Sequence, residues 1–588
     1  MKRRVIWLIT IAVVVMFGAT SQAQVNSYIS STNGFWDESR LWSLGVPPSV
    51  DQSGVFITND VSKTVTIDAI TASSFADTLT ISNLTISAPS GATNTLSLNN
   101  TGAMALQILN GFTITSGGTV LSSNSTVTVT GMLMDDGTLV FSGGDSLMPT
   151  NGTVQAGAVT ISEYDNAVLN VIGGTMTVAN GLNIAVGPFH GSLLVANGAH
   201  LVVTNGQILV QCGSTDSGGT LTVSNATLLG ADMWVGEGYR GNGELTINDG
   251  TVTLSGYLNI GSGDNGGSVE LNGGLLDVKN TDTQIAPFQN GIGGMSVSGG
   301  LFLTRNLSIA YYAESSGYFG ISGGSVLVGS NLQVGDGYNS IAGLSMSAGQ
   351  LVVTNGVITV DDPPAVPYCY PRNSCHAPPS ITVSGGELLA STIELARSGY
   401  PFGEGDGGML VVTGGTATVS GGITLGVCGT NTDLGATNMI GYVIVNGGQL
   451  TVTNASGTGF IDIQNGELLL SNGVVQVDKL VMTNSCGQLI HVGGTLIVGS
   501  FILGPNAPRI TSIVRQGNDL NISWILGPGQ TNALQATSGT ADGSYSTNGF
   551  TDVFVVTNTV TAGSVTNYVD PGATRNSPSR YYRVHWSP

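Results

Sequence analysis

The residues of this chain best suited to bind a ligand are tyrosines and charged residues in polar, glycine-rich stretches. These stretches include GEGYRGNG (236–243), YYAESSGY (311–318) and GDGYNS (335–340). Aromatic faces beside hydrogen-bonding groups suit sugar rings or a protein partner. The candidate ligand-binding residues are Tyr239, Arg240, Tyr311, Tyr312, Glu314, Tyr338, Arg397 and Tyr400.

Paired carboxylates, the groups that glycoside hydrolysis uses, occur as Asp135–Asp136 and Asp361–Asp362. Adjacent residues of a strand point to opposite faces, so neither pair converges on one substrate if it lies in a strand. Lys and Arg are few and dispersed, the five His residues lie far apart, and no Walker, Rossmann or zinc motif occurs. We therefore expect no catalysis and no catalytic residues, with a carbohydrate-active enzyme as the alternative.

Acidic residues in the glycine-rich stretches offer a further chemistry, Ca²⁺ binding. The spacing of calcium-binding β-roll repeats is absent. One carboxylate per stretch is a thin supply for an ion that takes six or more oxygen ligands. We expect no cofactor and no metal, with Ca²⁺ as the alternative, and the acids concerned are Glu237, Asp264, Asp336, Glu404 and Asp406.

All these residues lie in or near a repeat that runs from about residue 167 to residue 504. GELTINDGTVTLSGYLNIGSG (243–263) and GYFGISGGSVLVGSNLQVGDG (317–337) are two copies, each with three short runs of alternating apolar and polar residues. Alternation puts the apolar side chains on one face of a strand. Because the turns are too short for helical crossovers, the strands must coil, each parallel to its counterpart about 4.8 Å away.

The sequence thus predicts an all-β fold, a long right-handed parallel β-helix with three strands and roughly 24 residues per coil. We expect about 18 coils up to Gly504. The candidate ligand-binding residues then fall after the third strand of a coil, in the corner that is long and variable. The side of a repeat that accepts insertions is often its binding side. The plainer interpretation, that loop tips simply tolerate polar and aromatic residues, is the stronger of the two at this point.

The five cysteines divide into two groups. Cys369 and Cys375 lie in a Pro-rich insertion and are expected to form a local disulfide. Cys428 and Cys486 are about two coils apart, roughly 10 Å by the strand spacing, which exceeds the Cα separation of a disulfide. These two and Cys212 are expected to be buried as small apolar residues.

Composition limits the class of protein. Of 588 residues, 87 are Gly, 41% are hydrophobic and 9% are charged, so a continuous core is compatible with glycine at the corners. The net charge of −20 argues against nucleic acid as a partner, because phosphate contacts require Lys and Arg.

The N-terminus predicts export. Basic residues at 2–4 precede an apolar run at 5–17, and small residues follow at 21–23, which is the pattern of a signal peptide over 1–23. The run is too short to span a bilayer comfortably, so we expect no membrane span in the mature chain, with an uncleaved anchor as the alternative.

Residues 24–75 are expected to form an N-terminal capping segment ahead of the β-helix at 76–504. GFWDESRLWSLGVPPSVD (34–51) resembles the opening found ahead of many secreted bacterial β-solenoid repeats. Trp36 and Trp42 are expected to cover the first apolar layer, and sugar binding is the alternative.

Residues 505–588 have a different texture, with strands separated by turn signals such as GPGQ and DPGA. Trp524 in an early strand and the late RYYRVHW segment resemble a fibronectin type III-like β-sandwich. Similar short domains end many exported repeat proteins, which implies a role in sorting or attachment.

The repeat tract as a whole resembles the autotransporter-associated β-strand repeat class and pectin lyase-like solenoids. The resemblance implies a bacterial protein that is secreted or held on the outer surface of a Gram-negative-type cell. We expect a non-catalytic, adhesin-like rod whose variable edge meets a polysaccharide or a surface protein. A polysaccharide lyase or glycoside hydrolase on the same fold is the alternative, and a purely structural rod stays open.

Overall fold

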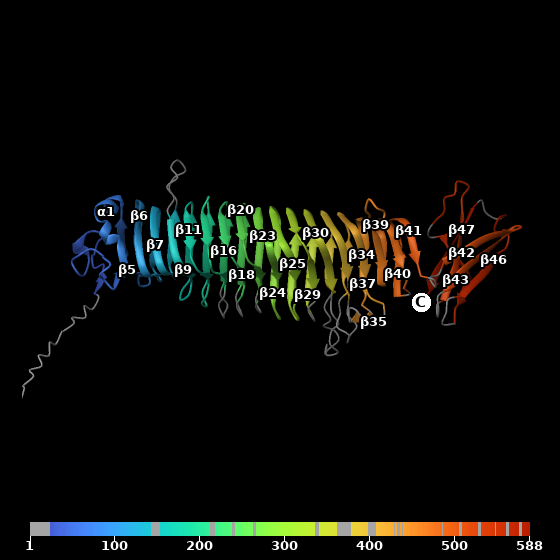
Figure 1. Ribbon diagram of the computed structural model, residues 1–588, viewed down its shortest axis with the longest axis horizontal. Helices are drawn as coiled ribbons and strands as arrows, with labels where there is room; N and C mark the ends of the chain where they lie inside the picture. Colours follow the sequence, from blue (N-terminus) through green and yellow to red (C-terminus); the bar gives the residue numbers. More distant parts are fainter. Residues whose placement is uncertain are drawn as a thin grey trace, which may run out of the picture.

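The computed structural model is an all-β protein, a right-handed parallel β-helix of about 16 turns followed by small antiparallel sheets. The predicted fold class is confirmed, and Figure 1 shows the β-helix as a long rod. The structure describes residues 24–142, 153–211, 218–237, 242–262, 266–335, 340–361, 378–397, 407–428, 430–431, 436–437, 439–484, 486–504, 509–526, 531–546, 549–559, 564–575 and 579–587.

Each coil repeats three strands in register with the coil before it. In one coil β10 (Ala167–Ile172), β11 (Thr175–Val178) and β12 (Leu182–Ile184) follow one another. The next coil supplies β13 (Gly191–Ala196), β14 (His200–Val203) and β15 (Ile208–Val210). All three pairs are parallel, for example Ala167 with Gly191 and Leu182 with Ile208. One repeat of the sequence therefore corresponds to one coil of the structure.

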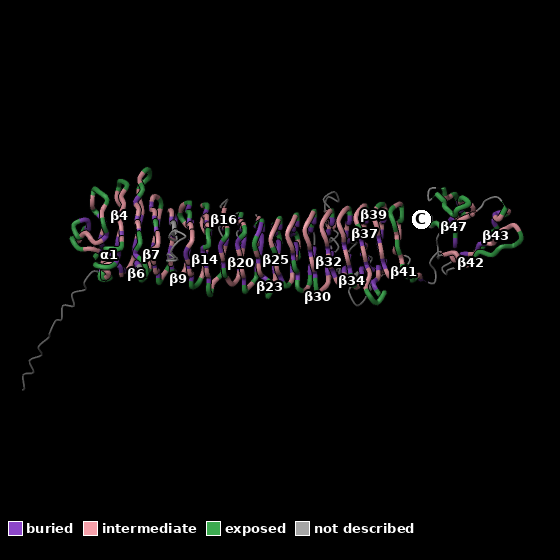
Figure 2. The backbone as a smooth tube through the Cα atoms, turned by 90° about the horizontal axis from the view of Figure 1, so that it is seen from above, coloured by how far each residue is buried: buried purple, intermediate pink, exposed green. Residues whose placement is uncertain are grey.

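The interior is one continuous column of stacked aliphatic side chains. Alternate residues of each strand point inward. The same place in successive coils is occupied by side chains that are at most 1% exposed: Ile184, Val210, Val235, Ile260 and Ile285. Figure 2 shows this buried stripe along the strands, with exposed residues at the corners. Each fully buried side chain of this kind stabilises the fold by roughly 1.5–3 kcal/mol.

The corner between the first and second strands is closed by a column of glycines. Gly300, Gly324 and Gly349 have φ values of 73°, 64° and 78°, a region that side chains other than glycine rarely adopt. A Cβ on Gly324 would lie 2.6 Å from the carbonyl oxygen of Gly300 in the coil before it. Close stacking of backbones thus requires glycine at this corner.

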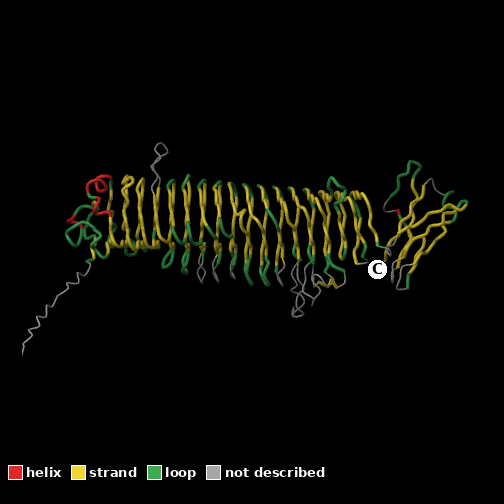
Figure 3. The backbone as a smooth tube through the Cα atoms, viewed as in Figure 1, coloured by secondary structure: helices red, strands yellow, loops and turns green. Residues whose placement is uncertain are grey.

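The rod has fewer coils than the predicted 18 because several coils are longer than the average repeat. Val360 pairs with Leu395, and Leu425 pairs with Ile463. Part of the extra length that the structure describes, residues 453–459, lies between the second strand, in β37 (Gly441–Val452), and the third strand, β38 (Phe460–Ile463). Figure 3 shows the loops along the lower edge of the rod, where the chain passes from the third strand of one coil to the next coil.

The parallel ladder begins closer to the N-terminus than the predicted boundary at residue 76. β1 (Val25–Ser27) pairs with β3 (Gly54–Ile57), and β2 (Gly34–Phe35) pairs with β4 (Lys63–Ile67). The helix α1 (Ala69–Ser74) follows, and the Asp68 carboxylate caps it by accepting from the backbone N–H groups of Ile70 and Thr71. Strands of the segment 24–75 therefore belong to the first coils of the β-helix.

Trp36 and Trp42 are buried inside these first coils. Their exposed fractions are 0% and 1%, and their ring centroids lie 5.2 Å apart. The Trp36 indole donates to the carbonyl of Thr78, and the Trp42 indole donates to the carbonyl of Trp36. Neither ring has a free face for a sugar, and both belong to the hydrophobic core of the solenoid.

The prediction for Cys428 and Cys486 is wrong. The two residues form a disulfide with a Cα–Cα distance of 5.9 Å, and both are half-buried. After Leu425 the chain is displaced along the rod axis toward the C-terminal coils. Two hydrogen bonds show this displacement: the Val427 N–H donates to the Met439 carbonyl, and the Asn465 side chain donates to the Val427 carbonyl. This displacement brings Cys428 closer to the last coil than the number of coils between the two cysteines suggests. Cys212, Cys369 and Cys375 lie outside the described residues.

After residue 508 the chain forms two three-stranded antiparallel sheets. β42 (Arg509–Gln516), β43 (Asp519–Leu526) and β46 (Ser564–Asp570) form one sheet. β45 (Thr551–Thr557), β44 (Thr531–Gly539) and β47 (Ser579–Ser587) form the other. Ile522, Trp524 and Leu534 form the core of this small domain. Its likeness to a fibronectin type III domain stays a prediction.

Candidate functional site

The third corner, between the third strand of one coil and the first strand of the next, positions the candidate site. Ala286 and Ala310 each follow a third strand with positive φ values of 55° and 51°. Their N–H groups donate to the carbonyls of Ile260 and Ile285 in the preceding coils, so the ladder continues around the corner. Phe288 and Tyr312 each lie two residues farther on and therefore leave the rod at equivalent places.

Four aromatic side chains form a contiguous row along this corner, which we call the aromatic row: Trp234, Phe288, Tyr312 and Tyr311. Trp234 lies in β18 (Met233–Val235), and Phe288 and the two tyrosines follow β23 (Gly274–Ile285) and β25 (Leu301–Ile309). The rings of Trp234 and Phe288 stack with centroids 5.9 Å apart, and Phe288 stacks on Tyr312 at 6.0 Å.

Tyr311 ends the row with a different orientation. Its ring lies 5.2 Å from that of Tyr312 at an interplanar angle of 84°, so it turns a face to one side of the row. Phe288, Tyr311 and Tyr312 are 43%, 42% and 45% exposed, whereas Trp234 is half-buried. An exposed group of aromatic rings of this size is uncommon on a protein surface without a binding role.

A buried amide lies beside the row. Asn259 pairs with Trp234 in the neighbouring coil and is 7% exposed. Its side-chain oxygen has no hydrogen-bond partner within the described residues. Leaving a buried polar atom without a hydrogen bond costs about 1–3 kcal/mol of stability, which a donor bound at this place would offset.

Glu314 and Gln289 add polar groups at the outer side of the row. The Gln289 side-chain amide donates to the Glu314 carboxylate at 3.0 Å, which joins two successive corners. Both side chains are exposed. Hydrogen-bonding groups next to aromatic rings match what saccharides and polar protein surfaces require.

Of the predicted ligand-binding residues, Tyr311, Tyr312 and Glu314 lie together. Arg397 follows the same corner three coils farther along, about 14 Å away by the strand spacing. Its guanidinium donates to the side chain of Gln464 at 3.0 Å. Tyr239, Arg240, Tyr338 and Tyr400 lie outside the described residues.

The described carboxylates of the two acidic pairs, Asp135, Asp136 and Asp361, do not converge, and Asp362 lies outside the described residues. Asp136 and Asp361 occupy the same corner position as Ala286 and Ala310, nine coils apart, which is about 43 Å. The Asp136 carboxylate accepts from the backbone N–H groups of Glu163 and Tyr164 at 2.6 and 2.9 Å. The Asp361 carboxylate accepts from the N–H of Arg397 at 2.6 Å. Both carboxylates thus hold the next corner in place.

Asp135 points into the core instead. It pairs with Ile114 and Ile161 in the interior column and has no exposed surface. One carboxylate oxygen accepts from the Gly137 N–H, and the other has no partner in the described part of the chain. Burial raises the pKa of Asp135 from 3.8 to about 7. The neighbouring Asp136 raises it further, while the Gly137 hydrogen bond opposes the shift.

The acids considered for Ca²⁺ are mostly outside the described residues: Asp264, Asp336, Glu404 and Asp406. Glu237 is described, and burial raises the pKa of its carboxyl. Across the described ranges, no three His, Cys, Asp or Glu side chains gather closely enough to hold a metal ion.

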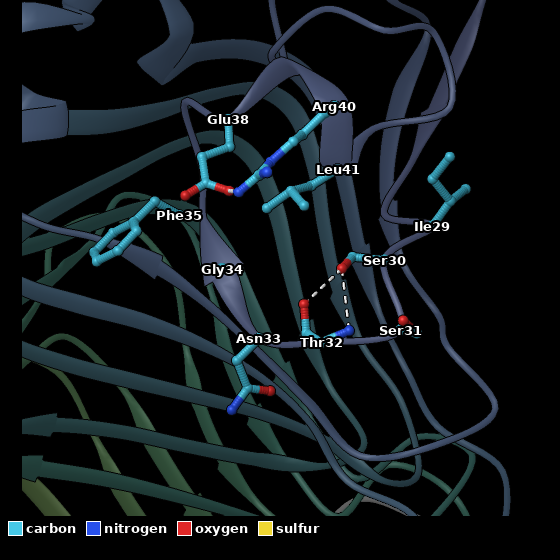
Figure 4. Close-up of a pocket in the computed structure, with 10 residues that line it drawn as sticks. All are labelled: Ile29, Ser30, Ser31, Thr32, Asn33, Gly34, Phe35, Glu38, Arg40 and Leu41. Atoms are coloured by element: carbon cyan, nitrogen blue, oxygen red, sulfur yellow. Dashed lines mark hydrogen bonds and ion pairs between the residues drawn. The ribbon is translucent and has the colours of Figure 1, made fainter.

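An open pocket lies at the N-terminal end, lined by residues 29–35, 38, 40 and 41 (Figure 4). Its polar groups pair with one another, since Ser30 bonds to Thr32 and Arg40 forms an exposed ion pair with Glu38 at 3.4 Å. Exposed ion pairs contribute little, and the pocket has no convergent set of groups for chemistry.

Sequence reasoning missed Trp234, Phe288, Asn259 and Gln289. Trp234 lies in a strand, so a search confined to the corners overlooks it. The equivalent spacing of Phe288 and Tyr312 after Ala286 and Ala310 was the available signal. The comparisons add no relative: no protein-family model, no curated protein and no solved structure matches this chain. Of the helices within the described ranges, none is both long and apolar enough to cross a bilayer.

Proposed function

We propose that this chain is an exported, non-catalytic rod that binds a glycan or a protein partner through the aromatic row. The observation that carries the proposal is the row itself. Rings from three separate coils stack against one another, Trp234 from a third strand and the other three from the third corner, and three of the four are more than 40% exposed. Such a row costs solubility, and no such row lies at the first corner in the part of the chain that the structure describes, so binding is the function that accounts for it best.

Rigidity supports this role. The row is held by parallel ladders on both sides, for example Leu307 to Leu332 and Ile285 to Ile309. A binding surface that is already ordered loses little conformational entropy when a ligand arrives. Many weak contacts along a stiff edge then add up to a useful affinity.

The absence of catalysis in this proposal rests on the carboxylates. Glycoside hydrolysis needs two carboxyl groups about 5–9.5 Å apart. Asp136 and Asp361 are held by backbone N–H groups nine coils apart, and Asp135 is enclosed in the core. Export draws support from the predicted leader and from the Cys428–Cys486 disulfide, because disulfides persist in oxidising compartments.

The test is binding of the mature chain, residues 24–588, to arrays of polysaccharides, glycans and surface proteins. Phe288→Ala, Tyr311→Ala and Tyr312→Ala are each expected to weaken binding about tenfold, since an aromatic contact contributes roughly 1–1.5 kcal/mol. Tyr164→Ala is the matched control, because Tyr164 occupies the corner position of Tyr312 six coils away and is 66% exposed.

Equal affinity in all variants would refute the row as the binding site. Release of reducing ends or unsaturated sugars from a polysaccharide would instead identify an enzyme. Binding retained by the Tyr164 variant and lost by the others would support the proposal.

A further inference from the structure

Tyr318 is an exposed ring on the outer face of the β-helix, close in sequence to the aromatic row. It lies in β26 (Ser316–Ile321), the first strand of its coil, six residues after Tyr312. Phe319 and Ile321 point into the core, so Tyr318 points outward, and 54% of its surface is exposed. The strands on either side, β24 (Ile292–Val297) and β29 (Ile341–Met346), lie in the middle of the rod (Figure 1). The ring is therefore open to a ligand from the side of the rod.

Three glycines surround this ring on the same face of the sheet. Gly294 and Gly343 pair with Tyr318 in the coils before and after it. Gly320 follows in the same strand and faces outward like Tyr318. A Cβ on Gly343 would lie 3.4 and 3.6 Å from the Cδ1 and Cε1 atoms of Tyr318, so the ring leans toward this glycine. Tyr318 is therefore flanked by bare backbone on three sides.

The fold does not require glycine at these three positions, in contrast to the column at the first corner. None of the three has a positive φ. A Cβ on Gly294 would meet no atom within 4 Å, and one on Gly320 would lie 3.9 Å from the Ser345 hydroxyl, an ordinary contact. Glycine inside a strand is less stable than alanine, and it often marks a place where a ligand approaches the backbone closely. The glycines thus favour a molecule that rests directly on the sheet beside Tyr318.

The sheet face around Tyr318 is uncharged over six coils. Glu270 in the coil before it and Glu467 in the coil after it are the nearest acids on the same face. An anionic ligand would find no cation on these strands, in a chain of net charge −20, and a cationic ligand would find no carboxylate there. The face therefore matches an uncharged ligand. The first strands of the six coils contain no Asp, Glu, Lys or Arg: residues 292–297, 316–321, 341–346, 380–383, 409–412 and 441–445.

We infer that the ligand is a neutral polysaccharide, with one sugar stacked on Tyr318 and the chain lying on the glycines beside it. The inference rests on the proposed function and extends the binding surface from the aromatic row onto this sheet face. The apolar face of a sugar packs on a tyrosine ring, and its hydroxyls suit the exposed Ser296 and Ser345, which pair with Gly320.

Two observations select a polysaccharide from the other uncharged partners. Protein interfaces are enriched in aromatic residues, Met and Arg and depleted in Ser, so a ring among glycines and serines suits one poorly. Tyr442 occupies the same row as Tyr318 four coils farther along, about 19 Å away by the strand spacing. A chain of several sugars reaches both rings, whereas a single sugar does not.

The test measures binding of the mature chain, residues 24–588, to four neutral polymers, amorphous cellulose, xylan, mannan and chitin, and to two acidic ones, polygalacturonate and alginate. At least one neutral polymer is expected to bind, and neither acidic one. Tyr318→Ala is expected to weaken binding about tenfold. Tyr257→Ala is its control, because Tyr257 is 48% exposed at the second corner, and it is expected to bind like the native chain.

Gly294→Gln tests the floor beside the ring. Because a Cβ has room there, the variant is expected to keep or raise the melting temperature. Its side chain would occupy the place of the ligand, so affinity is expected to fall at least tenfold. Thr220→Gln, on the same row three coils earlier, is the control and is expected to bind like the native chain.

Equal binding of acidic and neutral polymers, binding to none of the polymers, or native affinity in both Tyr318→Ala and Gly294→Gln would overturn the inference. Native affinity in those two variants with weak binding by Phe288→Ala would leave the aromatic row as the site without this face. The reverse result, weak binding by the two variants and native affinity in Phe288→Ala, would support this face and refute the row.

Discussion

The first and third corners of the rod both turn the chain from one strand to the next, but they differ in which residue types they accept. At the first corner, glycine occupies one position in nine successive coils, from Gly274 to Gly494, each with positive φ. At the third corner the equivalent column mixes residue types, among them Ser162, Gln211, Ala310 and Asp361. One corner is fixed by backbone stacking, whereas the other accepts change.

The difference follows from how closely the chain of one coil approaches the next. At the first corner the backbones touch, so a Cβ meets a carbonyl oxygen of the preceding coil. At the third corner the chain leaves the stack and returns by a path of variable length. Side chains there are free to serve a ligand, as in the aromatic row, or to bind the next corner, as Asp136 does.

The variety of residue types at the third corner extends to Asp135, a carboxyl group in the core just before that corner. The pH dependence of stability tests what its burial costs. Its folded pKa of about 7 lies above the unfolded value of 3.8, so the native state holds the proton more tightly. The free energy of unfolding is therefore expected to decrease by about 4 kcal/mol in total as pH rises from about 4 to about 7. Urea midpoints measured from pH 4 to pH 8 would report this loss.

Asp135→Asn is the control for that measurement. The variant is expected to lose the pH slope and to exceed the native chain in stability at pH 8. A slope that survives in the variant would place the titrating group elsewhere.

Gly324→Ala tests the rigid corner. The left-handed backbone and the contact with the Gly300 carbonyl are expected to cost about 3 kcal/mol together. Ala310→Gly at the third corner is the counterpart and is expected to change stability by less than about 1 kcal/mol. Denaturation midpoints compare the two, and equal effects would remove the distinction between the corners.

Asp136→Ala tests whether a corner carboxylate holds its neighbour. Two backbone N–H groups would lose their acceptor, and we expect a loss of about 2 kcal/mol. Asp136→Asn keeps an acceptor oxygen and should lose less. Faster amide hydrogen exchange at Glu163 and Tyr164 in the alanine variant would localise the effect, and unchanged exchange would contradict it.

Tyr312→Ala gives the smallest expected change in stability, about 0.5 kcal/mol, because the ring is 45% exposed and packs on other surface rings. A thermal melt of the variant should nearly overlay that of the native chain. A large drop in the melting temperature would show that the row supports the fold more than it serves a ligand.

The sequence was sufficient to predict the β-helix, because period-two alternation and regular glycines follow directly from backbone geometry. The positions of Tyr311, Tyr312 and Glu314 at one corner followed from the same alignment of coils. These features depend on local spacing, which a sequence displays. The number of coils was less predictable, because insertions such as the one between Val360 and Leu395 lengthen a coil without adding one.

Other features depend on how a corner travels in space. The displacement of the chain after Leu425 along the rod axis allows Cys428 and Cys486 to form a disulfide. Phe288 extends back toward the N-terminal coils, so that its ring stacks on that of Trp234. Neither displacement is encoded by spacing alone. The burial of Asp135 was likewise missed because an acid in an aliphatic column interrupts the pattern that identifies the column.

The equivalence of Ala286 and Ala310 has a consequence for how such a chain could be lengthened. Residues 286–309 span one full circuit between matching points of the ladder, and they include Phe288. A tandem copy of that stretch would insert as a complete layer, shift everything after it by one step, and add one more ring to the stack. Duplication of this stretch would therefore lengthen the rod and its row of aromatic rings in steps of one whole coil.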